Sequence, residues 1–152
     1  TGGRIKKIQP YIGNDENFLL TYGDGLSDVN ISELIKFHKS HGKIFTLTAV
    51  KPDSRFGYLD FDGDKVLSFR EKSNIDVPFI NGGFMVVRSE IFDYIEGDSM
   101  LEDKPFNKIV QAGEMCAYKH LGFWKCMDTI RDHRILEDLW KNKTAPWKVW
   151  TD

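Results

Sequence analysis

The chain has 152 residues with a formal net charge of −2, and 41% of its residues are apolar. This length and composition suit one globular domain with a buried core. The 21 basic residues are scattered along a balanced chain, which gives no basic surface for nucleic acid. No apolar stretch reaches the roughly 20 residues that span a bilayer. We therefore expect neither nucleic-acid nor membrane partners.

The two cysteines indicate a reducing compartment. Cys116 and Cys126 lie in apolar stretches without the spacing of metal ligands, which is typical of buried free thiols. Because such thiols are usual in the cytoplasm, we expect a cytoplasmic protein.

The first strong signal is a strand that stops at a glycine-flanked carboxylate. Residues 1–9 predict a short helix, and the apolar run Phe18–Tyr22 predicts a buried strand that ends at Gly23-Asp24-Gly25. In open α/β sheets, ligands bind beyond the carboxyl ends of strands. A carboxylate there can face an ion or a phosphate, although an Asp-Gly turn that merely redirects the chain gives the same pattern.

A helix and a second strand follow. Asn30 with Glu33 three residues later forms a capping box, which predicts a helix that Gly42 ends. The β-branched run Ile44–Val50 predicts the next strand. A strand, a helix and a strand make a βαβ unit, so we expect parallel pairing between Ile44–Val50 and the earlier strand.

The middle of the chain predicts a hairpin and a glycine-containing strand. Alternating strands over residues 56–61 and 65–69, joined at Asp62-Gly63, are typical of a β-hairpin. Residues 80–87 predict a buried strand that contains two glycines. Such glycines mark either the close approach of a ligand or another backbone, or a β-bulge.

The remaining elements complete an α/β pattern. They are helices near residues 89–97 and 105–113, strands over 115–118 and 123–127, and a last helix opened by Thr129 with Asp132. The predicted fold class is therefore α/β, with a Rossmann-like, doubly wound mixed sheet and an inserted β-hairpin.

Two carboxylates share one sequence context. Asp24 and Asp128 each follow an apolar strand and precede a turn or a helix start. In a doubly wound sheet both would face the same edge, where two hard oxygen ligands, water and substrate phosphates form the usual Mg²⁺ arrangement. Asp128 alone is also explained as a favourable charge at a helix N-terminus.

A second group of polar residues follows the hairpin. The ammonium of Lys72 suits a phosphate, and the carboxylate of Glu71 can accept hydrogen bonds from sugar hydroxyls. A solvated charge pair is the plain alternative for this dipeptide. The nearby Asn81-Gly82-Gly83 favours the functional interpretation.

This combination resembles the hexose-1-phosphate nucleotidylyltransferases over essentially the entire chain. The matching segments are Thr1-Gly-Gly-Arg4, Thr21-Tyr-Gly-Asp-Gly25, Arg55-Phe-Gly57, Phe69-Arg-Glu-Lys72, Ile80-Asn-Gly-Gly-Phe84, Gly122-Phe-Trp124, Met127-Asp-Thr129 and Ala145-Pro-Trp147. Each segment alone is weak, but their number and order are specific. The resemblance implies a fold of the nucleotide-diphospho-sugar transferase type.

The resemblance also implies residue roles. Asp24 and Asp128 would bind the cofactor Mg²⁺, and with Lys72, which would contact the sugar phosphate, they would form the catalytic group. Glu71 would bind the sugar hydroxyls. The sugar pocket would further include Gly57, Asn81, Gly82 and Gly83, and the nucleotide would meet Thr1, Gly2 and Arg4 near its base and Thr21, Tyr22 and Gly23 near its ribose.

The implied reaction is Mg²⁺-dependent transfer of CMP from CTP to α-D-glucose 1-phosphate, which yields CDP-glucose and pyrophosphate. The resemblance further implies a homo-oligomer that supplies nucleotide sugars for O-antigen and lipopolysaccharide biosynthesis. Two alternatives stay open. One is another sugar-1-phosphate nucleotidylyltransferase that uses dTTP or UTP, and the other is a non-catalytic module that binds sugar nucleotides.

One departure from the family pattern affects domain organisation. The family begins with a glycine-rich GGxGTR-type loop, which holds the triphosphate, and a Pro-Lys element, and this sequence contains neither. We expect residues 1–152 to be the C-terminal part of a single nucleotidyltransferase domain, with the sugar- and metal-binding portion. By this resemblance, these residues alone would be inactive.

Overall fold

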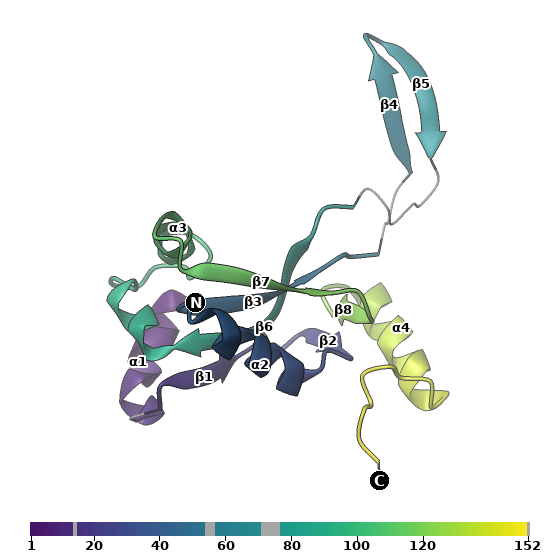
Figure 1. The fold of residues 1–152 in the computed structure, drawn as a ribbon. Helices are drawn as coiled ribbons and strands as arrows, with labels where there is room; N and C mark the ends of the chain where they lie inside the picture. Colours follow the sequence, from purple (N-terminus) through teal and green to yellow (C-terminus); the bar gives the residue numbers. More distant parts are fainter. Residues whose placement is uncertain (14, 54–56, 71–76, 152) are drawn as a thin grey trace. The chain divides into compact units, whose positions relative to one another are not determined.

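The structure, a computed structural model, describes residues 1–13, 15–53, 57–70 and 77–151. The chain forms two compact units, which we describe separately (Figure 1). The first unit contains Thr1–Gly23, Asn30–Thr48 and Gly82–Lys119, and the second contains Asp24–Val29, Ala49–Asn81 and His120–Asp152.

The elements follow the predicted order closely. The helices are α1 (Gly2–Ile12), α2 (Ile31–His41), the 3₁₀ helix η1 (Ser89–Asp93), α3 (Lys104–Gln111) and α4 (Ile130–Lys141). The strands are β1 (Asn17–Leu20), β2 (Gly25–Ser27), β3 (Phe45–Val50), β4 (Tyr58–Asp62), β5 (Lys65–Arg70), β6 (Ile80–Arg88), β7 (Met115–His120) and β8 (Trp124–Cys126). Among the described helices, none has the length and apolarity needed to cross a bilayer.

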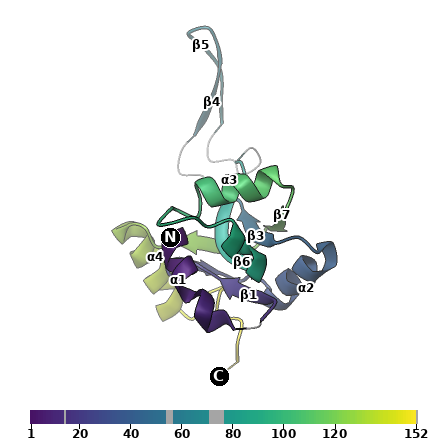
Figure 2. The same cartoon turned by 90° about the vertical axis from the view of Figure 1, so that its left-hand side faces the viewer.

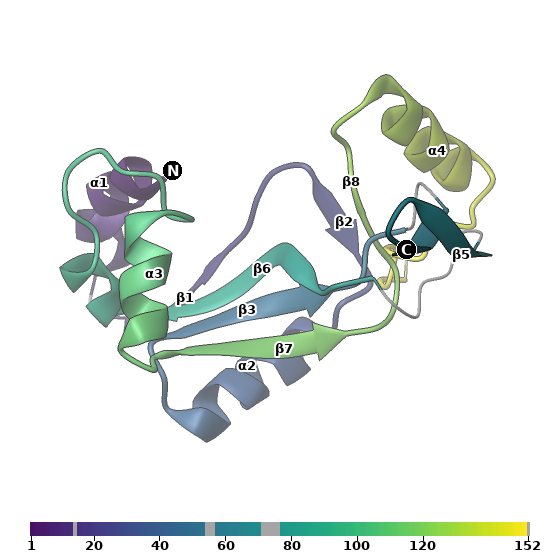
Figure 3. The ribbon, with the colours of Figure 1, turned by 90° about the horizontal axis from the view of Figure 1, so that it is seen from above.

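The main sheet has the strand order β1-β6-β3-β7 (Figure 3). β6 runs antiparallel to β1 and lies between β1 and β3, so the predicted direct pairing of the two βαβ strands is wrong. Burial explains the order. Three consecutive residues of β6, Met85–Val87, are almost completely buried, which requires a central position, whereas Leu19 of β1 is 56% exposed at the sheet edge.

Helices cover both faces of the sheet in the first unit, as a doubly wound fold requires. Phe45, Met85 and Val87 pack in one core cluster with apolar side chains of α1, η1 and α3. Thr46 follows Phe45 in β3 and therefore faces the opposite side, where its hydroxyl contacts His38 of α2. Figure 2 shows α1 and α2 on opposite sides of the strands. The mixed, doubly wound α/β fold is therefore confirmed.

A partly buried hydrogen-bond chain joins α2 to this sheet. The backbone N–H of Lys43 donates to His41 Nδ1 at 2.9 Å, and His41 Nε2 lies 2.8 Å from Thr46 Oγ1. That hydroxyl lies 2.8 Å from His38 Nδ1, and His38 Nε2 lies 2.9 Å from Asn17 Oδ1. One assignment gives each of these bonds one donor and one acceptor: both imidazoles accept at Nδ1 and donate from Nε2. Both imidazoles are therefore neutral in this chain of bonds.

Both predicted helix caps are confirmed. Asn30 Oδ1 accepts from the backbone N–H of Glu33 at 3.1 Å, and Gly42 ends α2 in the left-handed conformation at φ 66°. Thr129 Oγ1 accepts from the backbone N–H of Asp132 at 3.1 Å and opens α4. Each cap satisfies a backbone donor that a helix start leaves without an intrahelical partner.

The second unit contains two small antiparallel sheets and α4. The predicted hairpin is confirmed as β4 and β5, with Asp62 opposite Lys65 and with Gly63 at φ 57° in the turn. The other sheet joins β8 to β2, a strand that the sequence analysis did not predict. This ladder positions the two carboxylates considered next.

Candidate functional site

Two residues predicted to lie near the nucleotide meet at one carboxylate in the first unit. Thr1 Oγ1 donates to Glu102 Oε2 at 2.6 Å, and the Tyr22 hydroxyl donates to Glu102 Oε1 at 2.6 Å. Such short bonds are expected when the acceptor is ionised. The structure therefore joins Thr1, Tyr22 and Glu102, which are far apart in the sequence, in one cluster.

The side chain of Thr1 turns away from its own helix. Thr1 is the N-cap residue of α1, but its hydroxyl makes no capping bond there. Instead, the hydroxyl accepts from the backbone N–H of Leu101 at 2.8 Å. Gly2 follows and is buried, and a Cβ on it would lie 2.7 Å from the Ser99 carbonyl oxygen. The absence of a side chain at Gly2 therefore lets the loop of Ser99 and Leu101 reach the start of α1.

Tyr22 also explains one of the two strand glycines. Gly83 has φ 86°, and a Cβ on it would lie 2.5 Å from Tyr22 Cδ2. Only glycine combines this backbone conformation with such a close aromatic neighbour. The close neighbour of Gly83 is thus a side chain, the ring of Tyr22, whereas the sequence analysis expected a ligand, another backbone or a β-bulge. A sugar contact at Asn81, Gly82 and Gly83 stays a prediction.

In the second unit, Asp24 and Asp128 lie at the same end of one ladder. β2 and β8 pair antiparallel with Gly25 opposite Cys126, and the backbone N–H of Met127 donates to the Asp24 carbonyl oxygen at 2.9 Å. Asp24 precedes β2, Asp128 follows β8, and both residues are exposed. The ladder therefore brings the two residues to one end, with Asp128 after a strand as predicted and Asp24 directly before one.

This pair of carboxylates fits a magnesium ion. Mg²⁺ typically takes one or two carboxylates from a protein and completes its octahedron with water and substrate phosphates. Among the described residues, no group of three or more His, Cys, Asp or Glu side chains could hold a metal. Any Mg²⁺ at Asp24 and Asp128 would therefore keep most of its positions for water and substrate, as a phosphoryl-transfer metal does.

Cys126 contacts this candidate metal site. Its thiol donates to Asp128 Oδ2 at 3.1 Å. Burial, together with the hydrogen bond to Asp128, raises the pKa of the Cys126 thiol above its ordinary value. Cys126 therefore stays protonated at neutral pH and can hold the Asp128 carboxylate in one orientation.

Other contacts near this ladder were missed by the sequence analysis. Lys125 Nζ lies 3.4 Å from the buried carboxylate of Asp132 and 3.6 Å from Asp53. His120 Nε2 lies 2.8 Å from Asp28 Oδ1. The spacing of a capping box indicated Asp132 as a helix-start residue but did not indicate its contact with Lys125. The partners Asp53 and Asp28 are distant in sequence from Lys125 and His120, so no local pattern links them.

The other predicted site residues are spread over the two units. Thr21, Gly23 and Arg4 are exposed in the first unit. Gly57 is in the second unit, where a Cβ would lie 2.7 Å from Phe69 Cε2 across the hairpin, and Asn81 is partly buried in β6. Glu71 and Lys72 lie outside the described residues. The structure therefore leaves their roles, and those of the other substrate-side residues, as predictions.

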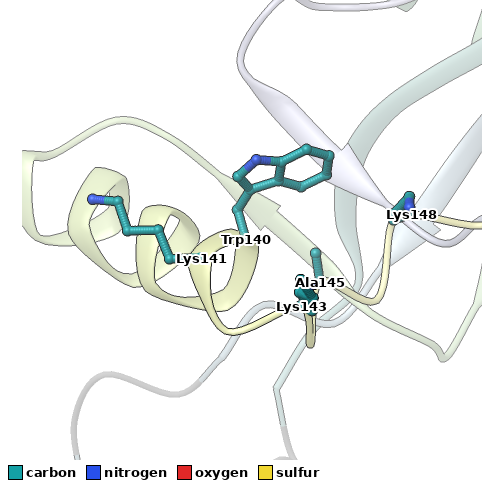
Figure 4. A pocket seen from close by; sticks show the side chains of 5 residues that line it. All are labelled: Trp140, Lys141, Lys143, Ala145 and Lys148. Atoms are coloured by element: carbon teal, nitrogen blue, oxygen red, sulfur yellow. The ribbon is translucent and has the colours of Figure 1, made fainter.

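A separate pocket of about 560 Å³ lies at the end of α4 (Figure 4). It is lined by Trp140, Lys141, Lys143, Ala145 and Lys148. Lys141 extends away from Trp140 and pairs with Glu137 at 3.0 Å. None of the residues predicted for substrate or metal lines this pocket, so it adds nothing to the candidate site.

Comparison with known proteins supplies the family context. The family model described as "Nucleotidyl transferase" matches residues 1–131. Glucose-1-phosphate cytidylyltransferase of Salmonella typhi is 48% identical over 151 residues, which cover 99% of this chain and 59% of that protein. Probable glucose-1-phosphate cytidylyltransferase of Bacillus subtilis is 40% identical over 152 residues, which again cover 99% of this chain and 59% of that protein.

A solved structure supports the fold independently. The crystal structure of a putative glucose-1-phosphate thymidylyltransferase from Bacillus anthracis, in complex with a sucrose, has a TM-score of 0.65 and 14% sequence identity. It aligns over 100% of this chain and 62% of its own length. The chain thus spans about three-fifths of the length of the relatives it matches.

Proposed function

Because the chain belongs to the nucleotidyl transferase family, we propose that the intact protein transfers CMP from CTP to α-D-glucose 1-phosphate. The products are CDP-glucose and pyrophosphate. The observation that carries this choice of substrates is the 48% identity to a glucose-1-phosphate cytidylyltransferase over 99% of the chain. The cytosine base and the glucose moiety are the specific parts of the proposal.

The candidate metal site supports the same chemistry. Asp24 and Asp128 lie at one end of the β2–β8 ladder, are exposed, and provide two hard oxygen ligands. When bound, Mg²⁺ would offset the charge on the phosphate oxygens. The backbone bond between Met127 and Asp24 would fix the spacing of the two carboxylates before substrate arrives.

The remaining roles concern substrate orientation. The phosphate oxygen of glucose 1-phosphate attacks the α-phosphorus of CTP, and pyrophosphate leaves. Lys72 would pair with the sugar phosphate and orient this nucleophile, while Glu71 would accept hydrogen bonds from sugar hydroxyls. The cluster of Thr1, Tyr22 and Glu102 would contact the nucleotide. In phosphoryl transfer, such positioning and charge stabilisation account for most of the catalysis.

A substrate panel tests this proposal. Pyrophosphate release by the intact protein is measured with Mg²⁺ and each pair of CTP, UTP, dTTP or GTP with glucose 1-phosphate or mannose 1-phosphate. We expect the highest kcat/KM for CTP with glucose 1-phosphate. A higher value for another nucleotide would assign the protein to a different nucleotidylyltransferase. No release with any pair would favour a non-catalytic sugar-nucleotide-binding module.

A further inference from the structure

Glu102 determines where two hydroxyl protons point. Each of its carboxylate oxygens accepts one hydroxyl, from Thr1 and from Tyr22, both at 2.6 Å. Although partial burial acts to raise it, the hydrogen bonds from Thr1 and Tyr22 hold the pKa of Glu102 below its ordinary value. An ionised carboxylate accepts hydrogen bonds and cannot donate them. Both hydroxyls are therefore held as donors toward Glu102.

This arrangement leaves Thr1 able only to accept from a ligand. A hydroxyl has one proton and two lone pairs. The proton goes to Glu102, and one lone pair accepts from the Leu101 N–H at 2.8 Å. Within the described part of the chain, no donor occupies the second lone pair, and Thr1 is exposed. A bound molecule can therefore reach the Thr1 hydroxyl, which can accept a hydrogen bond from it but cannot donate one.

We propose that Glu102 is a specificity-determining positioning residue, which makes Thr1 an acceptor and thereby favours a base with an amino donor over one with a carbonyl oxygen. This inference rests on the proposed function, in which Thr1 lies near the base. Cytosine presents an amino group at the position where uracil and thymine present an oxygen. A carbonyl facing Thr1 would set two acceptors against each other, and we expect a discrimination of roughly 10- to 100-fold from that mismatch.

The test compares CTP with UTP in the intact protein and in matched variants. Dissociation constants are measured by calorimetry, and kcat/KM is measured with glucose 1-phosphate. In Glu102→Gln the amide supplies a donor, so one hydroxyl can reverse. We expect the preference for CTP over UTP to fall at least about tenfold in both measurements, with the KM for glucose 1-phosphate unchanged.

Three further variants isolate the cause. Thr1→Val removes the acceptor and should lose the preference as Glu102→Gln does, whereas Thr1→Ser keeps the hydroxyl and should retain it. Asp103→Asn changes the neighbouring exposed carboxylate and should have no effect. If Glu102→Gln does not fold, as judged by its melting curve, the Thr1 pair decides the question.

The outcomes separate this inference from the proposed function. A wild-type protein that prefers CTP, with the same preference in Thr1→Val, would overturn the role of Glu102 and leave the function standing. Equal losses for CTP and UTP in a folded Glu102→Gln would also overturn it, because they indicate a general structural role. A wild-type protein that binds neither nucleotide would refute the proposed function itself, and this inference with it.

Discussion

The backbone N–H of Met127 donates to the carbonyl oxygen of Asp24 at 2.9 Å, which closes the end of the β2–β8 ladder beside Asp128. An antiparallel ladder holds residues at its end about 5 Å apart across the strands. The two carboxylates assigned to Mg²⁺ are therefore brought to one place by backbone pairing. Their side chains contribute little to packing, because both residues are exposed.

The first prediction concerns metal binding at this ladder end. Asp24→Asn in the intact protein should weaken the binding of Mn²⁺, a spectroscopic substitute for Mg²⁺, by at least about tenfold, because one charged ligand is lost. Stability should not change, since the side chain is exposed. Titration followed by electron paramagnetic resonance measures the affinity. Asp138→Asn, which changes an exposed carboxylate on α4, is the control. Equal affinity in Asp24→Asn and wild type would remove Asp24 from the metal site.

The second prediction concerns Gly83 and Tyr22. Gly83→Ala should lower the free energy of unfolding by about 2 kcal/mol or more, because the residue has φ 86° and its new methyl group would lie 2.5 Å from the Tyr22 ring. Gly113 also has a positive φ, but a Cβ there meets nothing within 4 Å. Gly113→Ala should therefore show only the conformational cost, about 1 kcal/mol. Urea unfolding compares the two variants, and equal losses would mean that the Tyr22 contact is unimportant.

The third prediction concerns pH. Burial, with smaller effects from His41 and Arg88, lowers the pKa of His38 from 6.5 to about 4. The unfolded chain therefore binds a proton at a higher pH than the folded protein does. The contribution of neutral His38 to the free energy of unfolding is complete above pH 6.5. It is lost as the pH falls from 6.5 toward 4, which lowers the free energy of unfolding by up to about 3 kcal/mol.

Unfolding at several pH values tests this prediction. The free energy of unfolding of wild type should fall more steeply between pH 6.5 and 4.5 than that of His38→Gln. His133→Gln, which changes an exposed histidine on α4, should keep the wild-type slope. An NMR titration of the His38 imidazole that gives a pKa near 6.5 would contradict the buried neutral state.

The fourth prediction concerns Lys72 and rests on family resemblance. Lys72→Ala in the intact protein should raise the KM for glucose 1-phosphate by roughly tenfold or more, because an ion pair with the sugar phosphate is lost. The KM for CTP should change much less. Initial rates measured while each substrate is varied in turn separate the two effects. A selective rise in the KM for CTP would instead place Lys72 at the nucleotide.

Local signals in the sequence predicted much of the fold, and non-local contacts explain what was missed. The caps at Asn30 and Thr129 depend on residues three positions away, so their patterns are visible in the sequence. The insertion of β6 beside β1 depends on burial across the whole sheet, which a local βαβ pattern does not contain. β2 has three residues, too few for a periodic signal.

The candidate site shows the same division. Asp24 and Asp128 were identifiable because each follows a strand or precedes a helix in a recognisable local context. Glu102 was not, because its partners Thr1 and Tyr22 are 101 and 80 residues away. A carboxylate in a loop before a helix has an ordinary local pattern, and only the folded chain connects it with the other two residues.

The most direct test of the proposed function is the identity of the product. The intact protein is incubated with CTP, glucose 1-phosphate and Mg²⁺, and the products are identified by mass spectrometry, with the Asp24→Asn/Asp128→Asn double variant treated in parallel. We expect CDP-glucose and pyrophosphate from wild type, almost none from the double variant, and none when Mg²⁺ is replaced by a chelator. Wild type that forms no sugar nucleotide, or a double variant that forms CDP-glucose at the wild-type rate, would contradict the account.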